Sequence, residues 1–152
     1  MERINMGRVL LGGIVAGIVG NILGFLVDGV ILGPQWTAAL KALGKPDFST
    51  NQIIVFNLIG LVYGVFAVWL YAAIRPRYGA GPKTALLAGL AVWVAGVLLP
   101  NVSFMGVAGL FPQDLTAMTT LAGVVEWAAA ILAGASVYKE STESARTMTA
   151  RA

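Results

Sequence analysis

The sequence predicts an all-α integral membrane protein, a four-helix bundle of two helical hairpins with a short interfacial helix between spans one and two. One observation is composition, since 58% of the 152 residues are hydrophobic and only 11% are charged. A soluble domain carries about 25% charged residues. The other observation is four apolar segments, each long enough to cross the roughly 30 Å hydrocarbon layer as a helix. Helices are expected because a spanning segment must satisfy its own backbone hydrogen bonds.

Local signals then place the elements along the chain. Ser49 and Gln52 match a capping box, which predicts that a helix begins there. Pro82 suits the first position of a helix and opens the third span. Pro100 lacks a backbone donor, so the third span is expected to kink or break near it. The expected spans are 9–32, 53–74, 84–110 and 115–138, in one domain over 1–138 that is followed by a polar cytoplasmic tail over 139–152.

The connection between spans one and two is predicted to contain a helix over 35–44. Pro34 opens it, Gly44 can adopt the left-handed conformation that ends a helix, and Pro46 prevents its continuation. Trp36 and Leu40 lie on one face of this helix, which is expected to rest on the membrane interface.

The basic residues predict the topology. Only Lys41 and Lys45 lie on one side of the membrane, and the other eight basic residues lie on the opposite side, so both termini are expected to be cytoplasmic. Membrane lipids are the expected partner, and nucleic acid is not, because no basic run with interleaved aromatic residues occurs. The residues expected to anchor lipid headgroups are Arg75, Arg77, Lys83, Trp36 and Trp69.

Small residues recur at helical spacing and indicate close helix packing. The glycines with this expected role are Gly13, Gly17, Gly20 and Gly24 in span one, Gly60 and Gly64 in span two, and Gly123 in span four. One interpretation is packing inside the bundle. The other is a seam for a second copy of the chain or for another membrane subunit, so a homo-oligomer or a larger complex is also expected.

A weak internal repeat accompanies this pattern. Residues 10–13 and 86–89 share Leu-Leu-x-Gly, and residues 58–62 and 121–125 share Leu-x-Gly-x-Val. The second match sets Tyr63 opposite Glu126. Two parallel hairpins related by an axis along the membrane normal would follow, although apolar sequences produce such matches often.

Glu126 lies near the middle of span four, where a charged side chain costs about 2.5–3.5 kcal/mol on insertion scales. Asn21 and Tyr63 are its expected partners, and Asp28 lies about one turn below the outer interface. Two interpretations remain open: a neutral acid that hydrogen bonds across the bundle, or a proton or cation site at the end of a wet vestibule. The candidate site comprises Glu126, Asp28, Asn21, Asn57, Tyr63 and Asn101.

Several enzyme classes are excluded. The chain has no cysteine and no histidine, which removes thiol catalysis, zinc sites and His-ligated haem. It contains no metalloprotease, nucleophile-elbow, phosphate-loop or dinucleotide-binding motif. Asp28 and Glu126 are expected at different depths, which argues against a catalytic carboxyl pair. No catalytic residue, metal or cofactor is predicted, although pigments or quinones bound by apolar contact alone would leave no sequence signal.

Residues 69–85, together with Trp36 and the Ala-Leu-Gly-Lys-Pro run at 42–46, are similar to uncharacterised small bacterial membrane proteins with four spans. The resemblance covers all four spans and implies the bacterial inner membrane. That group has no established activity, so no substrate or catalytic residue follows from it. The leading hypothesis is a non-enzymatic structural or accessory component, and the alternative is a small proton- or cation-coupled transporter or channel that uses Glu126.

Overall fold

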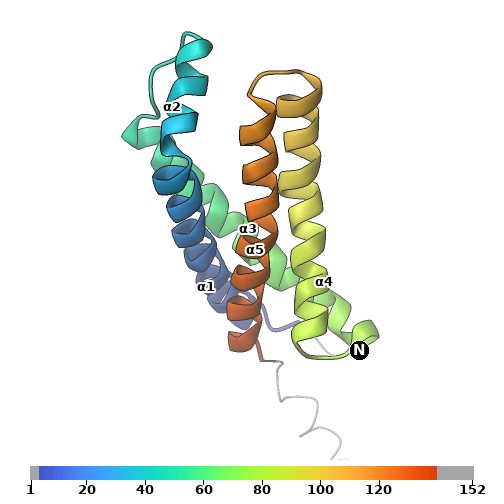
Figure 1. The fold of residues 1–152 in the computed structure, drawn as a ribbon. Helices are drawn as coiled ribbons and strands as arrows, with labels where there is room; N and C mark the ends of the chain where they lie inside the picture. The colour runs from blue at the N-terminus through green and yellow to red at the C-terminus, as the bar shows by residue number, and fades with distance from the viewer. Residues whose placement is uncertain (1–3, 140–152) are drawn as a thin grey trace, which may run out of the picture.

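The computed structural model describes residues 4–139, which form a helical bundle without strands (Figure 1). Four helical segments are long and apolar enough to cross a membrane, which makes this a multi-pass membrane protein: Met6–Ile31, Thr50–Tyr78, Pro82–Val107 and Gln113–Val137. The predicted fold class is confirmed, and each predicted span overlaps an observed one. The tail expected over 139–152 lies outside the described residues except for Lys139.

The spans divide into α-helical and π-helical elements. In chain order the elements are α1 (Met6–Gly24), η1 (Phe25–Ile31), α2 (Gly33–Ala42), α3 (Thr50–Tyr78), α4 (Pro82–Trp93), η2 (Val94–Leu98), η3 (Asn101–Val107) and α5 (Gln113–Val137), where η denotes a π-helix. We call the end of the bundle that holds the α3–α4 turn the inner end. The opposite end, which holds α2 and the connection from η3 to α5, is the outer end (Figure 1).

Local signals account for several helix boundaries. The backbone N–H of Ser49 donates to Oε1 of Gln52 at 2.8 Å, and the N–H of Gln52 donates to Oγ of Ser49 at 3.4 Å. These two bonds are the predicted capping box at the start of α3. The helix expected over 35–44 is α2, and Gly44 beyond its end has a φ of +67°, as a left-handed stop requires.

The outer ends of spans one and three are π-helical. The N–H of Leu32 donates to the carbonyl of Val27 at 2.8 Å, and the N–H of Ala108 donates to that of Ser103 at 3.1 Å. Each bond joins residues that are five positions apart, as in a π-helix. A distortion near Pro100 was predicted, because proline cannot donate to a carbonyl in the preceding turn. Span one ends in the same way without a proline, and no sequence signal pointed to it.

Arg75 lies in the last part of α3, which continues through Pro76 to Tyr78. The Arg75 guanidinium carbon lies 5.6 Å from the ring centre of Tyr71 and 5.3 Å from that of Tyr138. Its guanidinium group therefore packs on aromatic rings at the inner end, and its role as a lipid-headgroup anchor stays a prediction. The other anchors at this end are all exposed, namely Arg77, Lys83 and Trp69.

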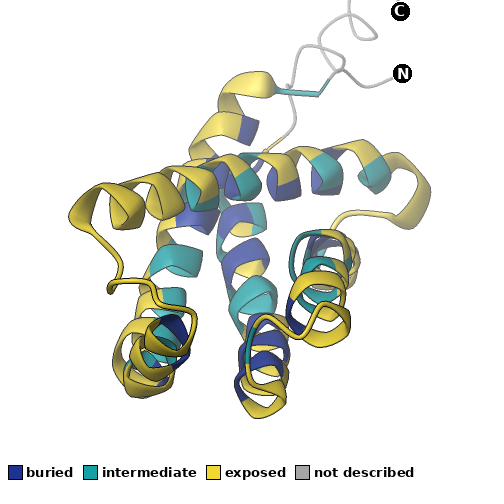
Figure 2. Cartoon of the chain, turned by 90° about the horizontal axis from the view of Figure 1, so that it is seen from above, coloured by how far each residue is buried: buried dark blue, intermediate teal, exposed yellow. Residues whose placement is uncertain are grey.

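The core of the bundle lies toward the inner end. There α1 packs against α3 and α5, and α4 packs against α5 and α3. Val9, Ala16, Val68, Ala88 and Ile131 are among the fully buried core residues. Figure 2 shows α3 lying across the other spans, with exposed residues over the part that reaches the outer end. The outer half is consequently more open than the inner half.

The predicted packing glycines all contact other helices of the same chain. Gly13 lies against Val65, and a Cβ added to Gly17 would lie 2.7 Å from Cα of Leu61. Gly64 lies against both Gly13 and Gly17, so the backbones of α1 and α3 touch. The remaining contacts pair Gly20 with Ala130, Gly24 with Glu126, Gly60 with Asn21, and Gly123 with Trp93 and Val97. The interpretation as packing inside the bundle is confirmed.

The internal repeat corresponds to a repeated structure. Adding 76 to the bounds of the first span, 6 and 31, gives the bounds of the third, 82 and 107. The same shift converts η1 (25–31) into η3 (101–107). Adding 63 to the first residue of α3, 50, gives that of α5, 113. The helix bounds of the first hairpin (residues 6–78) therefore recur at fixed offsets in the second hairpin (residues 82–137).

Candidate functional site

A groove of about 620 Å³ lies at the outer end, between the first span, α2 and the start of α3. It contains three of the six predicted site residues: Asn21, Asp28 and Asn57. The other lining residues are Gly20, Gly24, Phe25, Gly29, Gly33, Trp36, Thr37, Leu40, Asp47, Phe48, Ile53 and Phe56. We call this cavity the outer groove.

Asp28 is held by α2. The Nε1–H of Trp36 donates to Oδ1 of Asp28 at 3.1 Å. This bond forms because α2 folds back onto the bundle through a small core around Leu32, Ala39 and Leu115, against which Trp36 packs. The indole N–H of Trp36 can only donate, and it donates to the carboxyl group of Asp28. The expected role of Trp36 as a lipid-headgroup anchor stays a prediction.

Asn21 and Asn57 join the first span to α3. The side-chain amide of Asn21 donates to the backbone carbonyl of Asn57 at 3.0 Å. The side-chain amide of Asn57 donates to the carbonyl of Ile53 one turn earlier, at 2.8 Å. Asn21 is therefore not the hydrogen-bond partner of Glu126 that was expected.

Glu126 lies on the face of α5 that meets the first span. A Cβ added to Gly24 would lie 3.8 Å from its Oε2 atom, and Gly24 also lines the outer groove. Among the described residues, the Glu126 carboxyl group makes no hydrogen bond. It lies within electrostatic reach of Asp28. The two carboxyl groups therefore influence each other electrostatically, and the expected difference in their depths stays a prediction.

Tyr63 and Asn101 lie elsewhere. The Tyr63 ring packs on Trp127, with 5.8 Å between ring centres, and a Cβ added to Gly96 of span three would lie 2.9 Å from its Cε1 atom. The side-chain amide of Asn101 donates to Oγ1 of Thr120 at 2.9 Å. The outer groove therefore brings together three of the six candidate residues, and Tyr63 and Asn101 are not among its lining residues. Depth along a helix does not determine which way a side chain points.

Sequence reasoning missed most of the lining of the outer groove, including the aromatic and acidic side chains of Phe25, Asp47, Phe48 and Phe56. The rings of Trp36 and Phe48 are 6.2 Å apart, and those of Phe48 and Phe56 are 5.5 Å apart. One signal was available for Phe48, which directly precedes the helix cap at Ser49. An apolar residue at that position commonly packs back onto the helix.

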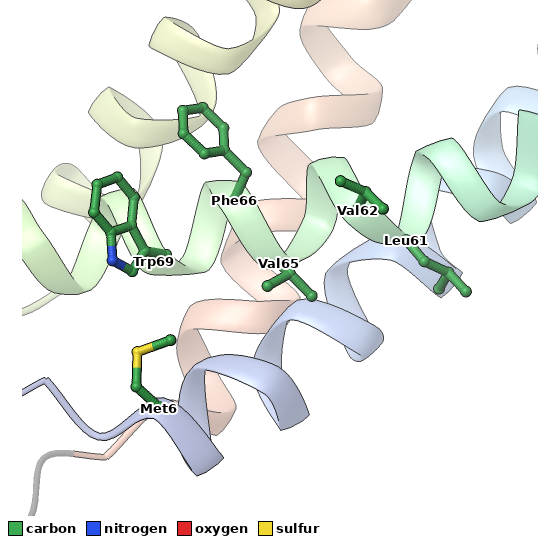
Figure 3. Close-up of a pocket in the computed structure, with 6 residues that line it drawn as sticks. All are labelled: Met6, Leu61, Val62, Val65, Phe66 and Trp69. Atoms are coloured by element: carbon green, nitrogen blue, oxygen red, sulfur yellow. The ribbon is translucent and has the colours of Figure 1, made fainter.

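A second hollow, of about 420 Å³, lies between the start of α1 and the middle of α3 (Figure 3). No charged residue lines it. Its lining residues are Met6, Leu61, Val62, Val65, Phe66 and Trp69. This hollow has the chemistry of a lipid-facing surface and lacks the carboxyl and amide groups of the outer groove.

Among the residues that the structure describes, no group of three or more carboxyl, imidazole or thiol side chains is arranged to hold a metal ion. No family model matches the chain, and neither a curated protein nor a solved structure matches it.

Proposed function

We propose that this chain is a non-enzymatic protein of the bacterial inner membrane that binds a proton or another cation in the outer half of the bundle and lets it permeate. The observation that carries the proposal is the position of Glu126, a carboxyl group inside a span without a hydrogen-bond partner among the described residues. An acidic residue inside a membrane span is a functional candidate by default.

The structural interpretation of Glu126 requires a partner on another helix. Its two expected partners bond or pack elsewhere, Asn21 with Asn57 and Tyr63 with Trp127. A carboxyl group left without a partner in an apolar setting is unfavourable. A bound proton or cation would remove that cost, and the nearby Asp28 carboxyl group would strengthen the attraction for positive charge.

The direction of access follows from charge. Five of the seven basic residues that the structure describes lie at the inner end, namely Arg8, Arg75, Arg77, Lys83 and Lys139. The positive-inside rule therefore favours a cytoplasmic inner end and cytoplasmic termini. The outer groove would then face away from the cytoplasm, and Gly24 would connect its floor to Glu126. A cation would enter through the groove and reach the carboxyl group from there.

A structural or accessory role is the second candidate. It rests on exposed apolar side chains of α3 that do not line the outer groove, such as Val55, Leu58 and Ile59. The predicted glycine faces no longer support it, because those glycines contact helices of their own chain. Association with a second copy or with another membrane subunit stays a prediction. It would use lipid-facing side chains of this kind.

The test is cation flux in proteoliposomes, measured separately for protons and for sodium under an imposed membrane potential. We expect Glu126→Gln to abolish the flux while the protein still purifies as a folded species, because the change removes a charge and keeps the shape. Tyr63→Phe is the matched control, since Tyr63 occupies the position in the first hairpin that Glu126 occupies in the second. It is expected to keep the flux. Unchanged flux in Glu126→Gln would overturn the proposal.

A further inference from the structure

We infer that the outer groove binds an organic ammonium ion, a positively charged amine with apolar substituents. This inference deepens the proposed function, because it names the class of cation that the groove would admit. It is carried by the chemistry of the groove wall and by the volume of the groove.

Three aromatic rings in the wall of the groove contact one another in a row. Trp36, Phe48 and Phe56 follow one another with 6.2 and 5.5 Å between successive ring centres. The Phe48 and Phe56 rings meet edge to face at 89°, so the faces of these rings turn in different directions. Ring faces carry negative potential and attract cations, and quaternary ammonium groups are commonly recognised by such aromatic walls.

The charge of the groove has one sign. Two carboxyl groups line it, those of Asp28 and Asp47, and no lysine or arginine is among its lining residues. Trp36 donates to Oδ1 of Asp28 and fixes this carboxyl group beside the aromatic wall. An anionic ligand would meet two carboxyl groups and no basic residue. A neutral apolar ligand would leave those carboxyl groups unused.

The volume and the ligand set favour an organic cation over a bare metal ion. About 620 Å³ lies within the range of small-molecule sites. A calcium ion requires six to eight oxygen ligands at short distance. Among the described residues, no group of three or more carboxyl, imidazole or thiol side chains could hold a metal ion. An ammonium group with methyl or aryl substituents is recognised by a carboxylate together with aromatic rings. Asp28 and the rings of Phe48 and Phe56 all line the outer groove.

The test is isothermal titration of the purified full chain in nanodiscs with benzyltrimethylammonium. Its neutral isostere neopentylbenzene, in which carbon replaces the ammonium nitrogen, is the matched control ligand. We expect the cation to bind and the isostere to bind at least about tenfold more weakly, because the rings and Asp28 attract charge. Equal affinity for the two ligands, or no binding of the cation, would overturn the inference.

Three variants locate the site. Asp28→Asn is expected to weaken binding about tenfold, and Phe56→Leu about threefold, in line with the loss of one ring face. Phe104→Leu is the matched control, because Phe104 is 65% exposed at the outer end and does not line the groove. An equal loss of affinity in Phe104→Leu and Phe56→Leu would place binding outside the groove and overturn the inference.

The two proposals fail separately. Proton or sodium flux that depends on Glu126, without binding of benzyltrimethylammonium, would overturn the inference about the groove and leave the proposed function intact. Charge-selective binding that needs Asp28, without any cation flux, would overturn permeation and leave the groove as a binding site.

Discussion

The two hairpins of this protein share the same helix packing and differ in the polar side chains that they carry. In each hairpin, a glycine of the leading span packs on the same position of the following helix. Gly13 lies against Gly64, and Gly89 lies against Trp127, where a Cβ added to Gly89 would be 3.2 Å from the Trp127 carbonyl oxygen. Because 64 and 127 differ by 63, like the starts of the two following helices, the register of the two helix pairs is the same.

Hydrogen bonds recur at this register too. The backbone carbonyl of Asn57 accepts from the side chain of Asn21, and the carbonyl of Thr120, its counterpart, accepts from Nε1 of Trp93 at 2.9 Å. Each following helix is thus tied to its leading span at the same height. In the first hairpin an amide supplies the donor, whereas in the second an indole does.

The polar groups of the site lie where the repeats differ. Asn21 has Val97 as its counterpart, and Asp28 has Phe104. The first hairpin also contains α2, whereas the connection in the second hairpin runs only from 108 to 112. Since α2 supplies Trp36, the outer groove has no equivalent in the second hairpin. The comparison teaches that small and apolar residues recur in both hairpins, and that the polar residues of the outer groove lie where the repeat departs from itself.

The comparison predicts its largest effect at Gly64. Gly64→Leu would drive a side chain into the backbone of Gly13 and Gly17, and overpacking of this kind costs about 1–3 kcal/mol or more. We expect loss of the folded monodisperse species in size-exclusion chromatography and a sharply lower Tm. Gly106→Leu is the control, because the nearest atom to a Cβ at Gly106 is 3.9 Å away. An equal decrease in Tm in both variants would contradict the claim that close packing at glycines such as Gly64 holds the hairpins together.

A smaller effect is predicted for Asn21→Val, which gives the first hairpin the residue found at the counterpart position, Val97. The change removes the bond to the Asn57 carbonyl, and one such bond contributes about 0.5–1.5 kcal/mol. We therefore expect a modest decrease in Tm with the fold retained. Ile22→Val, at a neighbouring residue that is 55% exposed, is expected to leave Tm unchanged. A decrease as large as that of Gly64→Leu would contradict this ranking.

Hydropathy and local helix signals predicted the fold well, because the four spans are uniformly apolar and the cap at Ser49 depends on neighbouring residues only. The candidate site was predicted in part. Asn21, Asp28 and Asn57 do line one groove, since sequence position sets the height of a residue along its span. The partner of a side chain depends on rotation about the helix axis, which sequence position did not reveal for Glu126. The π-helical register of η1 and η3 changes that rotation further.

The sequence also did not predict which elements come together to form the outer groove. Phe48 belongs to the connection before α3, and it reaches Trp36 only because α2 folds back onto the bundle. The hairpin comparison, in contrast, was visible as a faint repeat of short motifs. The structure shows that helix bounds and glycine contacts recur at the same offsets as those motifs.

The most direct test of the account compares two polar residues of the outer half, one from each hairpin, by cation flux in proteoliposomes. Asp28→Asn removes, from the first hairpin, a carboxyl group of the outer groove that interacts electrostatically with Glu126. Asn101→Ala removes the bond to Thr120 in the second hairpin. The account predicts that Asp28→Asn lowers the flux severalfold or more and that Asn101→Ala leaves it near the unmodified value. An equal decrease in both would show that the two hairpins share one vestibule and would contradict the division of chemistry between them.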